Sequence, residues 1–236
     1  TLGIEDGFTE VKTDEFTLKL VNASQTVAGL YPNSDPDFDF TPGERIEIRD
    51  KDGIYYIGDL NFRIKGEDGQ WESFSTAKNR KKVEALTVSG DVLAAADLSN
   101  TLGNNNPLSI KRYYEKKDGA LVLRFEITNP TNKSVVIGAL GTPMAFNNIL
   151  EGKHLDETHA DNVFFDPYIG KDAGYVEVKH LTGEGQVLLV LPEQNMPFEA
   201  YRPLNDDPTT RSIVFEGVHE WMALSKAYAE KEWKGK

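Results

Sequence analysis

The sequence predicts a mainly β protein, built as a large antiparallel β-sandwich with a short C-terminal helix. Two observations support this fold class. Apolar and polar residues alternate along many short runs, and turn signals, above all Asp-Gly dipeptides, separate those runs. About a dozen candidate strands follow one another at short spacing, which is typical of a sandwich. An up-and-down barrel would show the same local pattern and is the alternative.

Alternation gives each predicted strand one apolar and one polar face. Leu60, Phe62 and Ile64, for example, are separated by Asn61 and Arg63. Because successive side chains of a strand point to opposite faces, such a run predicts a strand packed on a core from one side. Further runs of this kind occupy residues 16–20, 46–48, 121–127 and 175–179.

Turn signals divide these runs, and two segments depart from the pattern. The three Asp-Gly turns are Lys51-Asp52-Gly53, Glu67-Asp68-Gly69 and Lys117-Asp118-Gly119. Residues 187–191 are apolar throughout, which predicts a strand buried on both faces. Residues 223–233 are rich in Ala, Leu, Lys and Glu, which predicts the C-terminal helix.

Composition limits the function classes. The 236 residues suffice for one sandwich domain over residues 1–236, which we expect to be the N-terminal part of a larger protein. The net charge of −12 argues against a nucleic-acid partner, and residues 78–82 are expected to be a solvated basic turn. The absence of cysteine excludes thiolate catalysis and cysteine-ligated zinc. No apolar stretch approaches the roughly 18 residues that span a bilayer.

Four metal-ligating side chains gather in one short polar segment. His154, Asp156, His159 and Asp161 lie within eight residues of sequence. Imidazole and carboxylate groups suit zinc, manganese or iron, but the two histidines are five residues apart, which does not match a helical zinc motif. We therefore expect a polar surface loop, with a metal site as the alternative, and we assign no metal or cofactor.

No catalytic residue can be assigned from the sequence. Glu199 and Glu220, flanked by Phe198 and Trp221, are the carboxylates nearest to a desolvated setting, yet no distinctive acid–base pair emerges. Phosphate loops, dinucleotide motifs and serine nucleophile elbows are absent. The glycines of residues 138–141 are expected to allow a close approach between chain segments.

The candidate carbohydrate-binding site is the irregular, polar segment at residues 147–170. Aromatic rings stack on sugar faces while amide and carboxylate groups bind hydroxyls, and loops on a rigid scaffold often carry such sites. The predicted contact residues are Asn147, Asn148, His159, Asp161, Phe165, Asp166 and Tyr168. The alternative is a surface flap whose aromatics pin it to the core. Among other aromatic candidates, Trp71, Tyr113 and Tyr114 are each expected to be structural, with sugar stacking as the alternative.

Several motifs resemble the N-terminal β-sandwich of six-hairpin-glycosidase-like secreted proteins. They are IKRYYE at residues 110–115, LVLRFEITN at 121–129, IGALGTPMAFNN at 137–148, FDPYIG at 165–170 and HEWM at 219–222. The resemblance runs over residues 2–233. It implies a supersandwich of the galactose-mutarotase-like type, followed in the intact protein by an (α/α)6 barrel that these 236 residues do not contain.

The resemblance also implies a function. The barrel of such proteins carries the catalytic carboxylates, while sandwich loops help to wall the cleft. We therefore expect a non-catalytic, carbohydrate-associated domain of a secreted glycoside hydrolase, with an oligosaccharide or polysaccharide and the downstream barrel as its partners. The alternatives are a stand-alone lectin-type module and a mutarotase or epimerase. For the last, His180 with Glu177 or Glu199 could supply the acid and the base.

Overall fold

The protein is mainly β, as the sequence predicts. The computed structural model describes residues 4–41, 56–77, 82–147, 162–165, 176–180, 185–191, 193, 199–201, 213–215, 218–224 and 231–233. The described strand pairs are all antiparallel. The helical segments in this part of the chain are two single 3-10 turns, η1 (Ile4–Asp6) and η3 (Ser99–Thr101). Within the same ranges, no helix has the length and apolar character needed to cross a bilayer.

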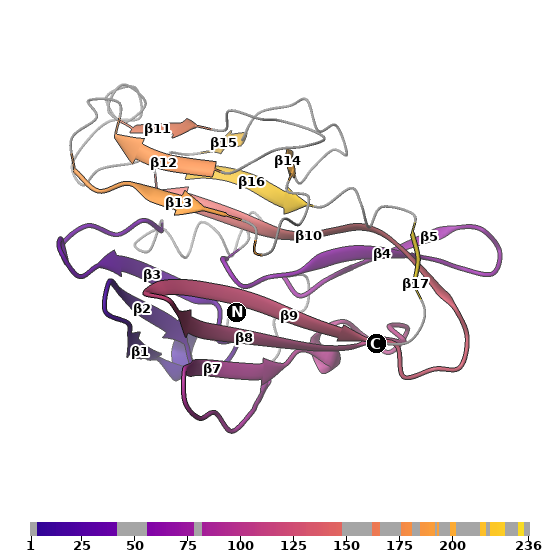
Figure 1. The fold of residues 1–236 in the computed structure, drawn as a ribbon. Coiled ribbons are helices and arrows are strands. Elements are labelled where there is room, and N and C mark those ends of the chain that lie inside the picture. The colour runs from indigo at the N-terminus through magenta and orange to yellow at the C-terminus, as the bar shows by residue number, and fades with distance from the viewer. Residues whose placement is uncertain are drawn as a thin grey trace.

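The described strands form four sheets, whose arrangement Figure 1 shows. The first contains β1 (Phe8–Lys12), β2 (Phe16–Val21) and β3 (Val27–Pro32). The second contains β6 (Glu84–Ala85), β7 (Val92–Asp97), β8 (Ser109–Lys117) and β9 (Ala120–Thr128). The third contains β4 (Asn61–Lys65), β5 (Trp71–Ser75), β10 (Val135–Asn147), β14 (Glu199–Tyr201), β15 (Ile213–Phe215), β16 (Val218–Leu224) and β17 (Lys231–Trp233). The fourth contains β11 (Asn162–Phe165), β12 (Val176–His180) and β13 (Leu188–Val190).

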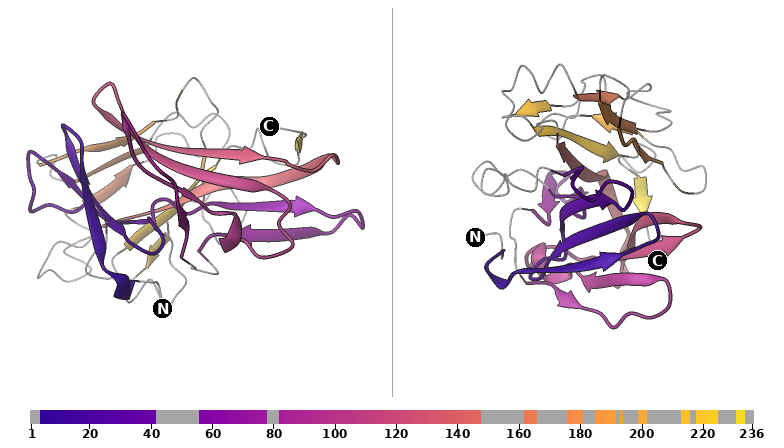
Figure 2. Two further views of the ribbon diagram at one scale, coloured as in Figure 1. Left: turned by 90° about the horizontal axis from the view of Figure 1, so that it is seen from below. Right: turned by 90° about the vertical axis from the view of Figure 1, so that its left-hand side faces the viewer.

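The core contains two large hydrophobic clusters, and the layer formed by β7, β8 and β9 contributes to both of them. At the end of β9 near the β8–β9 turn, Leu121 and Leu123 pack on the cluster that contains Leu18 and Leu30 of the first sheet. At the other end of β9, Phe125 and Ile127 pack on a second cluster, to which β4, β5, β7, β8, β10 and the loops between them contribute buried residues. Figures 1 and 2 show β1–β3 beside one end of this layer and β4, β5 and β10 beside the other. The sandwich therefore opposes one layer to two sheets.

Local sequence explains the hairpins. Asp118 and Gly119 between β8 and β9 have φ angles of 50° and 80°, as the two central residues of a type I′ turn require. Gly69, between β4 and β5, has a φ of 78°. Both predicted Asp-Gly turns in the described ranges are confirmed, whereas Lys51-Asp52-Gly53 lies outside those ranges.

Three predictions about single segments are wrong in part. The helix expected at residues 223–233 is replaced at both ends by strands, because β16 and β17 pair with β10, and such pairing overrides helix propensity. Residues 147–170 are not irregular throughout, since β11 forms within them and pairs with β12. Residues 187–191 are partly buried on one face only, because Leu188 and Val190 pack on the core while Leu189 is 51% exposed.

Candidate functional site

Most of the predicted sugar-contacting residues fall outside the described ranges. Asn147 is the last residue of β10 and pairs with Val218, whereas Phe165 is the last residue of β11 and pairs with Glu177. The two residues therefore belong to different sheets. The remaining members of the predicted set lie outside the described residues: Asn148, His159, Asp161, Asp166 and Tyr168.

The residues considered for a metal site and for mutarotase-type catalysis either lie outside the described ranges or do not all share one sheet. His154, Asp156, His159 and Asp161 all fall outside the described residues. Across the ranges that the structure does describe, no group of three or more His, Cys, Asp or Glu side chains could hold a metal ion. For the mutarotase alternative, Glu177 and His180 share strand β12, but Glu199 belongs to β14 in another sheet.

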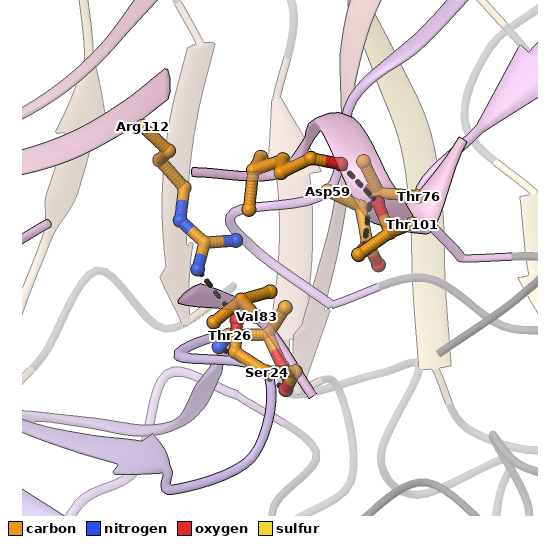
Figure 3. A pocket seen from close by; sticks show the side chains of 8 residues that line it. Ser24, Thr26, Asp59, Thr76, Val83, Thr101 and Arg112 are labelled. Atoms are coloured by element: carbon orange, nitrogen blue, oxygen red, sulfur yellow. Dashed lines mark hydrogen bonds between the residues drawn. The ribbon is translucent and has the colours of Figure 1, made fainter. Parts of the chain in front are cut away.

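A buried polar cluster surrounds Arg112 of β8 (Figure 3). Strand alternation directs Arg112 inward, so that only 1% of it is exposed. Its Nη1 atom donates a hydrogen bond of 2.6 Å to the Gly58 carbonyl oxygen, and its Nη2 atom donates one of 2.6 Å to the Ser24 carbonyl oxygen. Beside it, the Thr76 hydroxyl donates to the Asp59 Oδ1 atom at 2.8 Å. The Arg112 guanidinium of β8 thus bonds to the β2–β3 loop and to the segment that precedes β4.

The cavity inside this cluster is too small for a substrate. Its volume is about 10 Å³, and its lining includes Ser24, Thr26, Thr101 and Arg112. A cavity of this size holds about one water molecule at most. The Arg112 cluster is therefore a structural element of the core rather than a binding site.

Tyr114, two residues further along β8, is a fixed hydrogen-bond donor. Burial raises the pKa of its phenol to about 12, with Arg112 opposing and Asp59 adding to the effect. The hydroxyl therefore stays protonated at neutral pH and donates to the Gln25 carbonyl oxygen at 2.7 Å. Gly58 makes room for this arrangement, because a Cβ atom there would collide with the Tyr114 hydroxyl and approach Arg112 Nη1 to 3.2 Å. Gly58 also has a φ of 105°, which favours glycine.

Trp71 lies against the polar face of β4 and β10. The Arg63 guanidinium carbon is 4.4 Å from the centre of its ring, and Lys65 Nζ is 5.7 Å away. Gly138 permits this packing, since a Cβ atom there would be 3.0 Å from the indole and 2.9 Å from Arg63 Nε. The expected close approach at residues 138–141 is therefore confirmed at Gly138. The Trp71 ring thus makes favourable cation–π contacts with Arg63 and Lys65, and Arg63 covers one face of the ring.

Tyr113 and Arg124 form a similar cation–π pair on β8 and β9, on the face opposite to that of Arg112 and Tyr114. The Arg124 guanidinium carbon is 4.0 Å from the centre of the Tyr113 ring. Its Nη2 and Nε atoms also donate to Glu115 at 2.6 and 3.1 Å. These hydrogen bonds hold the pKa of the Glu115 carboxyl below its usual value, so Glu115 is unsuited to serve as a general acid.

A larger groove opens between the first two sheets. It has a volume of about 260 Å³ and is lined by β1, β2, β7 and the residues that precede β7. Its aliphatic lining includes Val11, Leu20, Leu86, Val88, Leu93 and Ala94. Its polar lining consists of Thr9, Asn22 and Gln25. We call this feature the β1–β7 groove.

The sequence did not reveal the β1–β7 groove or the Arg112 cluster. A signal for Arg112 was present, because it occupies an inward position between Ile110 and Tyr114 in an alternating run. A charged residue at a core-facing position predicts a buried polar network. The groove had no such signal, because it depends on how two sheets meet.

Comparison with known proteins identifies a family and a fold. A family model described as a family of unknown function (DUF5695) matches residues 19–236. A search of curated proteins finds no match. Among solved structures, the 4-alpha-glucanotransferase from Thermococcus litoralis is similar at 13% identity with a TM-score of 0.50, over 97% of this chain and 36% of that enzyme. This chain thus spans about a third of the enzyme's length.

A second solved structure extends the comparison to a shorter protein. It is a galactose mutarotase-like protein from Lactobacillus casei, at 11% identity and a TM-score of 0.48, over 92% of this chain and 87% of that one.

Proposed function

Because this chain belongs to the family of unknown function DUF5695, we propose its role from its fold: a carbohydrate-associated β-sandwich domain that binds a glycan without catalysing its cleavage. The observation that carries this proposal is the backbone likeness to a 4-alpha-glucanotransferase over nearly the whole chain. Fold alone does not determine function, so the proposal also depends on the motif resemblance to glycosidase-associated sandwiches described above.

The non-catalytic part of the proposal is supported by the geometry of the described polar groups. The buried Arg112 cluster has room for one water molecule at most, and Tyr114 is committed to a carbonyl oxygen. The Glu115 carboxyl has a lowered pKa, which opposes proton donation. In the described part of the chain these groups stabilise structure.

The glycan cleft is proposed to involve residues 147–170. In this proposal the domain continues into an (α/α)6 barrel in a secreted protein, and the segment helps to wall the cleft between them. Support comes from the amide, imidazole and aromatic groups of the segment, which offer hydroxyl partners and stacking faces. Asn147 is the last residue of β10 and Phe165 is the last residue of β11, so this segment begins at the end of one strand and contains the other.

The test is glycan binding by this chain and by the full-length protein, measured on a glycan array and then by calorimetry. Asn148→Ala, His159→Ala and Tyr168→Ala should each weaken glycan binding at least tenfold, with little change in melting temperature. Asn104→Ala and Phe8→Ala change exposed residues elsewhere and serve as controls. Unchanged affinity together with a lower melting temperature would show that the segment is structural.

A second measurement addresses catalysis. This chain should release no product from a panel of oligosaccharides. Turnover that disappears in Glu199→Gln or Glu220→Gln would contradict the non-catalytic assignment, whereas turnover that survives both changes would indicate a contaminant.

A further inference from the structure

Two short segments of the chain match the acceptor triplet for N-glycosylation, which is Asn, then any residue except proline, then Ser or Thr. They are Asn22-Ala23-Ser24 and Asn132-Lys133-Ser134. The asparagine amide nitrogen receives the glycan, and the transferase also requires the hydroxyl group two residues later. The triplet alone is a weak signal, so the surroundings of these two groups decide which triplet the folded protein presents.

The Asn132 triplet lies in the loop between β9 and β10, and its three residues are exposed. Within the described ranges, neither the Asn132 amide nor the Ser134 hydroxyl is engaged in a hydrogen bond. Lys133, between them, pairs with Glu67 of the β4–β5 turn, with 3.1 Å between Nζ and Oε1. Both groups that a transferase must reach are therefore accessible in the folded protein.

The shape of the β9–β10 loop does not depend on the Asn132 side chain. Asn129, which is 5% exposed, holds the loop from its first turn. Its Nδ2 atom donates to the Lys133 carbonyl oxygen at 2.8 Å, and its Oδ1 atom accepts the Thr131 backbone amide at 3.0 Å and the Thr131 hydroxyl at 2.6 Å. A glycan on Asn132 thus breaks none of the hydrogen bonds that shape the loop.

The Asn22 triplet is held in the fold. Asn22 is exposed, but its Nδ2 atom donates to the Asp6 carbonyl oxygen at 2.8 Å and its Oδ1 atom accepts the Thr9 hydroxyl at 2.5 Å. Ser24 is 6% exposed, and its hydroxyl lies 2.8 Å from that of Thr26. The Ser24 carbonyl oxygen also accepts a hydrogen bond from Arg112. A transferase could reach the Ser24 hydroxyl only if the Arg112 cluster came apart.

The β9–β10 loop also lies far from the proposed glycan cleft. Strand β10 begins at Val135, directly after the loop, and ends at Asn147, where the cleft segment begins (Figure 1). A strand of 13 residues spans about 40 Å. Exposed loops tolerate a bulky, solubilising modification better than buried segments. A glycan at this end of β10 therefore leaves the other end open.

We propose that Asn132 is an N-glycosylation site and that Asn22 is not. The proposal rests on the proposed secretion of the protein, because the donor is an oligosaccharide carried on a polyprenyl diphosphate in a secretory compartment. In the transfer step, the Asn132 Nδ2 atom forms a bond to the anomeric carbon of the first sugar, and the bond from that carbon to the diphosphate oxygen breaks. The polyprenyl diphosphate leaves with the bonding electrons, and Nδ2 loses one proton.

Secretion of the full-length protein from yeast, followed by mass spectrometry of its peptides, tests the assignment. Peptide N-glycosidase converts a glycosylated asparagine to aspartate, which marks the modified position. Residues 1–236 should carry one glycan, at Asn132, on most molecules, and its removal should leave the melting temperature unchanged. Because the readout is the mass of the chain's own peptides, the result is independent of whether the domain binds a glycan.

Variants separate the two triplets. Asn132→Gln and Ser134→Ala should each abolish the modification, whereas Ser134→Thr, which keeps the hydroxyl, should preserve it. Asn22→Gln is the matched control and should leave the glycan in place. Chains retained inside the cell are measured in the same way as secreted ones. The proposal is overturned if Asn132 is unmodified in the wild-type protein, if Asn22 carries a glycan, or if Ser134→Ala remains modified.

Discussion

Single residues at the junction of the sheets decide how this sandwich is held together. The alternation around Phe62 predicted a buried side chain, and Phe62 is 2% exposed. The same alternation could not predict what Arg112 bonds to, because its partners Ser24 and Gly58 are 88 and 54 residues away in sequence. Local patterns specify which side chains turn inward, whereas the partners of an inward polar group depend on tertiary assembly.

Arg112→Leu should lower the free energy of unfolding by about 3 kcal/mol or more, because two buried carbonyl groups lose charge-assisted hydrogen bonds. Urea unfolding would measure this change. Arg124→Leu is the control, since that arginine is partly exposed and its ion pair with Glu115 contributes about 1 kcal/mol or less. Equal losses in the two variants would contradict the structural role given to Arg112.

Gly58→Ala should be more destabilising than Gly103→Ala by about 2 kcal/mol, because both glycines have a positive φ but only Gly58 faces the Tyr114 hydroxyl. Gly103 has no atom within 4 Å of the place that a Cβ would occupy. Thermal unfolding measures both changes. In a Tyr114→Phe background the additional cost of Gly58→Ala should shrink, and an unchanged cost would argue against the contact.

Acid should weaken the Glu115–Arg124 pair. The pKa of Glu115 is lower in the folded protein than its usual value of 4.5, so the pair stabilises the fold above that pH. This contribution is lost as the pH falls below 4.5 through the folded value. Glu115→Gln should therefore lose less stability than wild type between pH 5 and pH 3, measured by urea unfolding. Glu67→Gln, at an exposed pair with Lys133, should behave like wild type.

At the scale of strands, alternation and turn chemistry predicted most elements of the described core. They failed where pairing partners are distant. β16 continues through Ala223 because β10 pairs with it, although the local composition favours helix. Residues 187–191 are apolar on both faces, yet one face remains exposed, since periodicity cannot tell whether a second layer covers a strand.

Adjacent leucines of β13 should respond differently to substitution. Leu188→Ala removes a side chain that packs on the core and should cost about 2 kcal/mol, whereas Leu189→Ala should change stability by less than about 0.5 kcal/mol. Chemical unfolding of the two variants makes the comparison. Similar losses would mean that both faces of β13 are covered.

At the scale of the whole molecule, the shared layer of β7, β8 and β9 joins the two halves of the core. The sequence predicted the sandwich but not the way two sheets share one opposing layer, because that arrangement follows from which strands pair. The residues predicted for the candidate site lie mostly outside the described ranges, so that site stays a prediction. The β1–β7 groove could not be predicted from the sequence, because it arises where two sheets leave space between small residues.

Leu18→Ala and Ile110→Ala should each lower stability by about 2–5 kcal/mol, since one lies in each cluster and both are fully buried. Because the two clusters share β7, β8 and β9, both variants should shift a single unfolding transition seen by circular dichroism and by tryptophan fluorescence. Two separate transitions, each affected by one variant, would show that the halves unfold independently.

The Arg112 hydrogen bonds also have a kinetic consequence. They span 54 and 88 residues, so the chain must close both loops before the guanidinium meets either carbonyl. Contacts with such separations are expected to form after the rate-limiting step of folding. Substitution of Arg112 should then change the folding barrier by only a small fraction of the change in stability, a ratio known as the kinetic φ-value. Replacing this side chain should then accelerate unfolding and leave the refolding rate nearly unchanged, so that Arg112 determines how long the folded protein lasts rather than how quickly it forms.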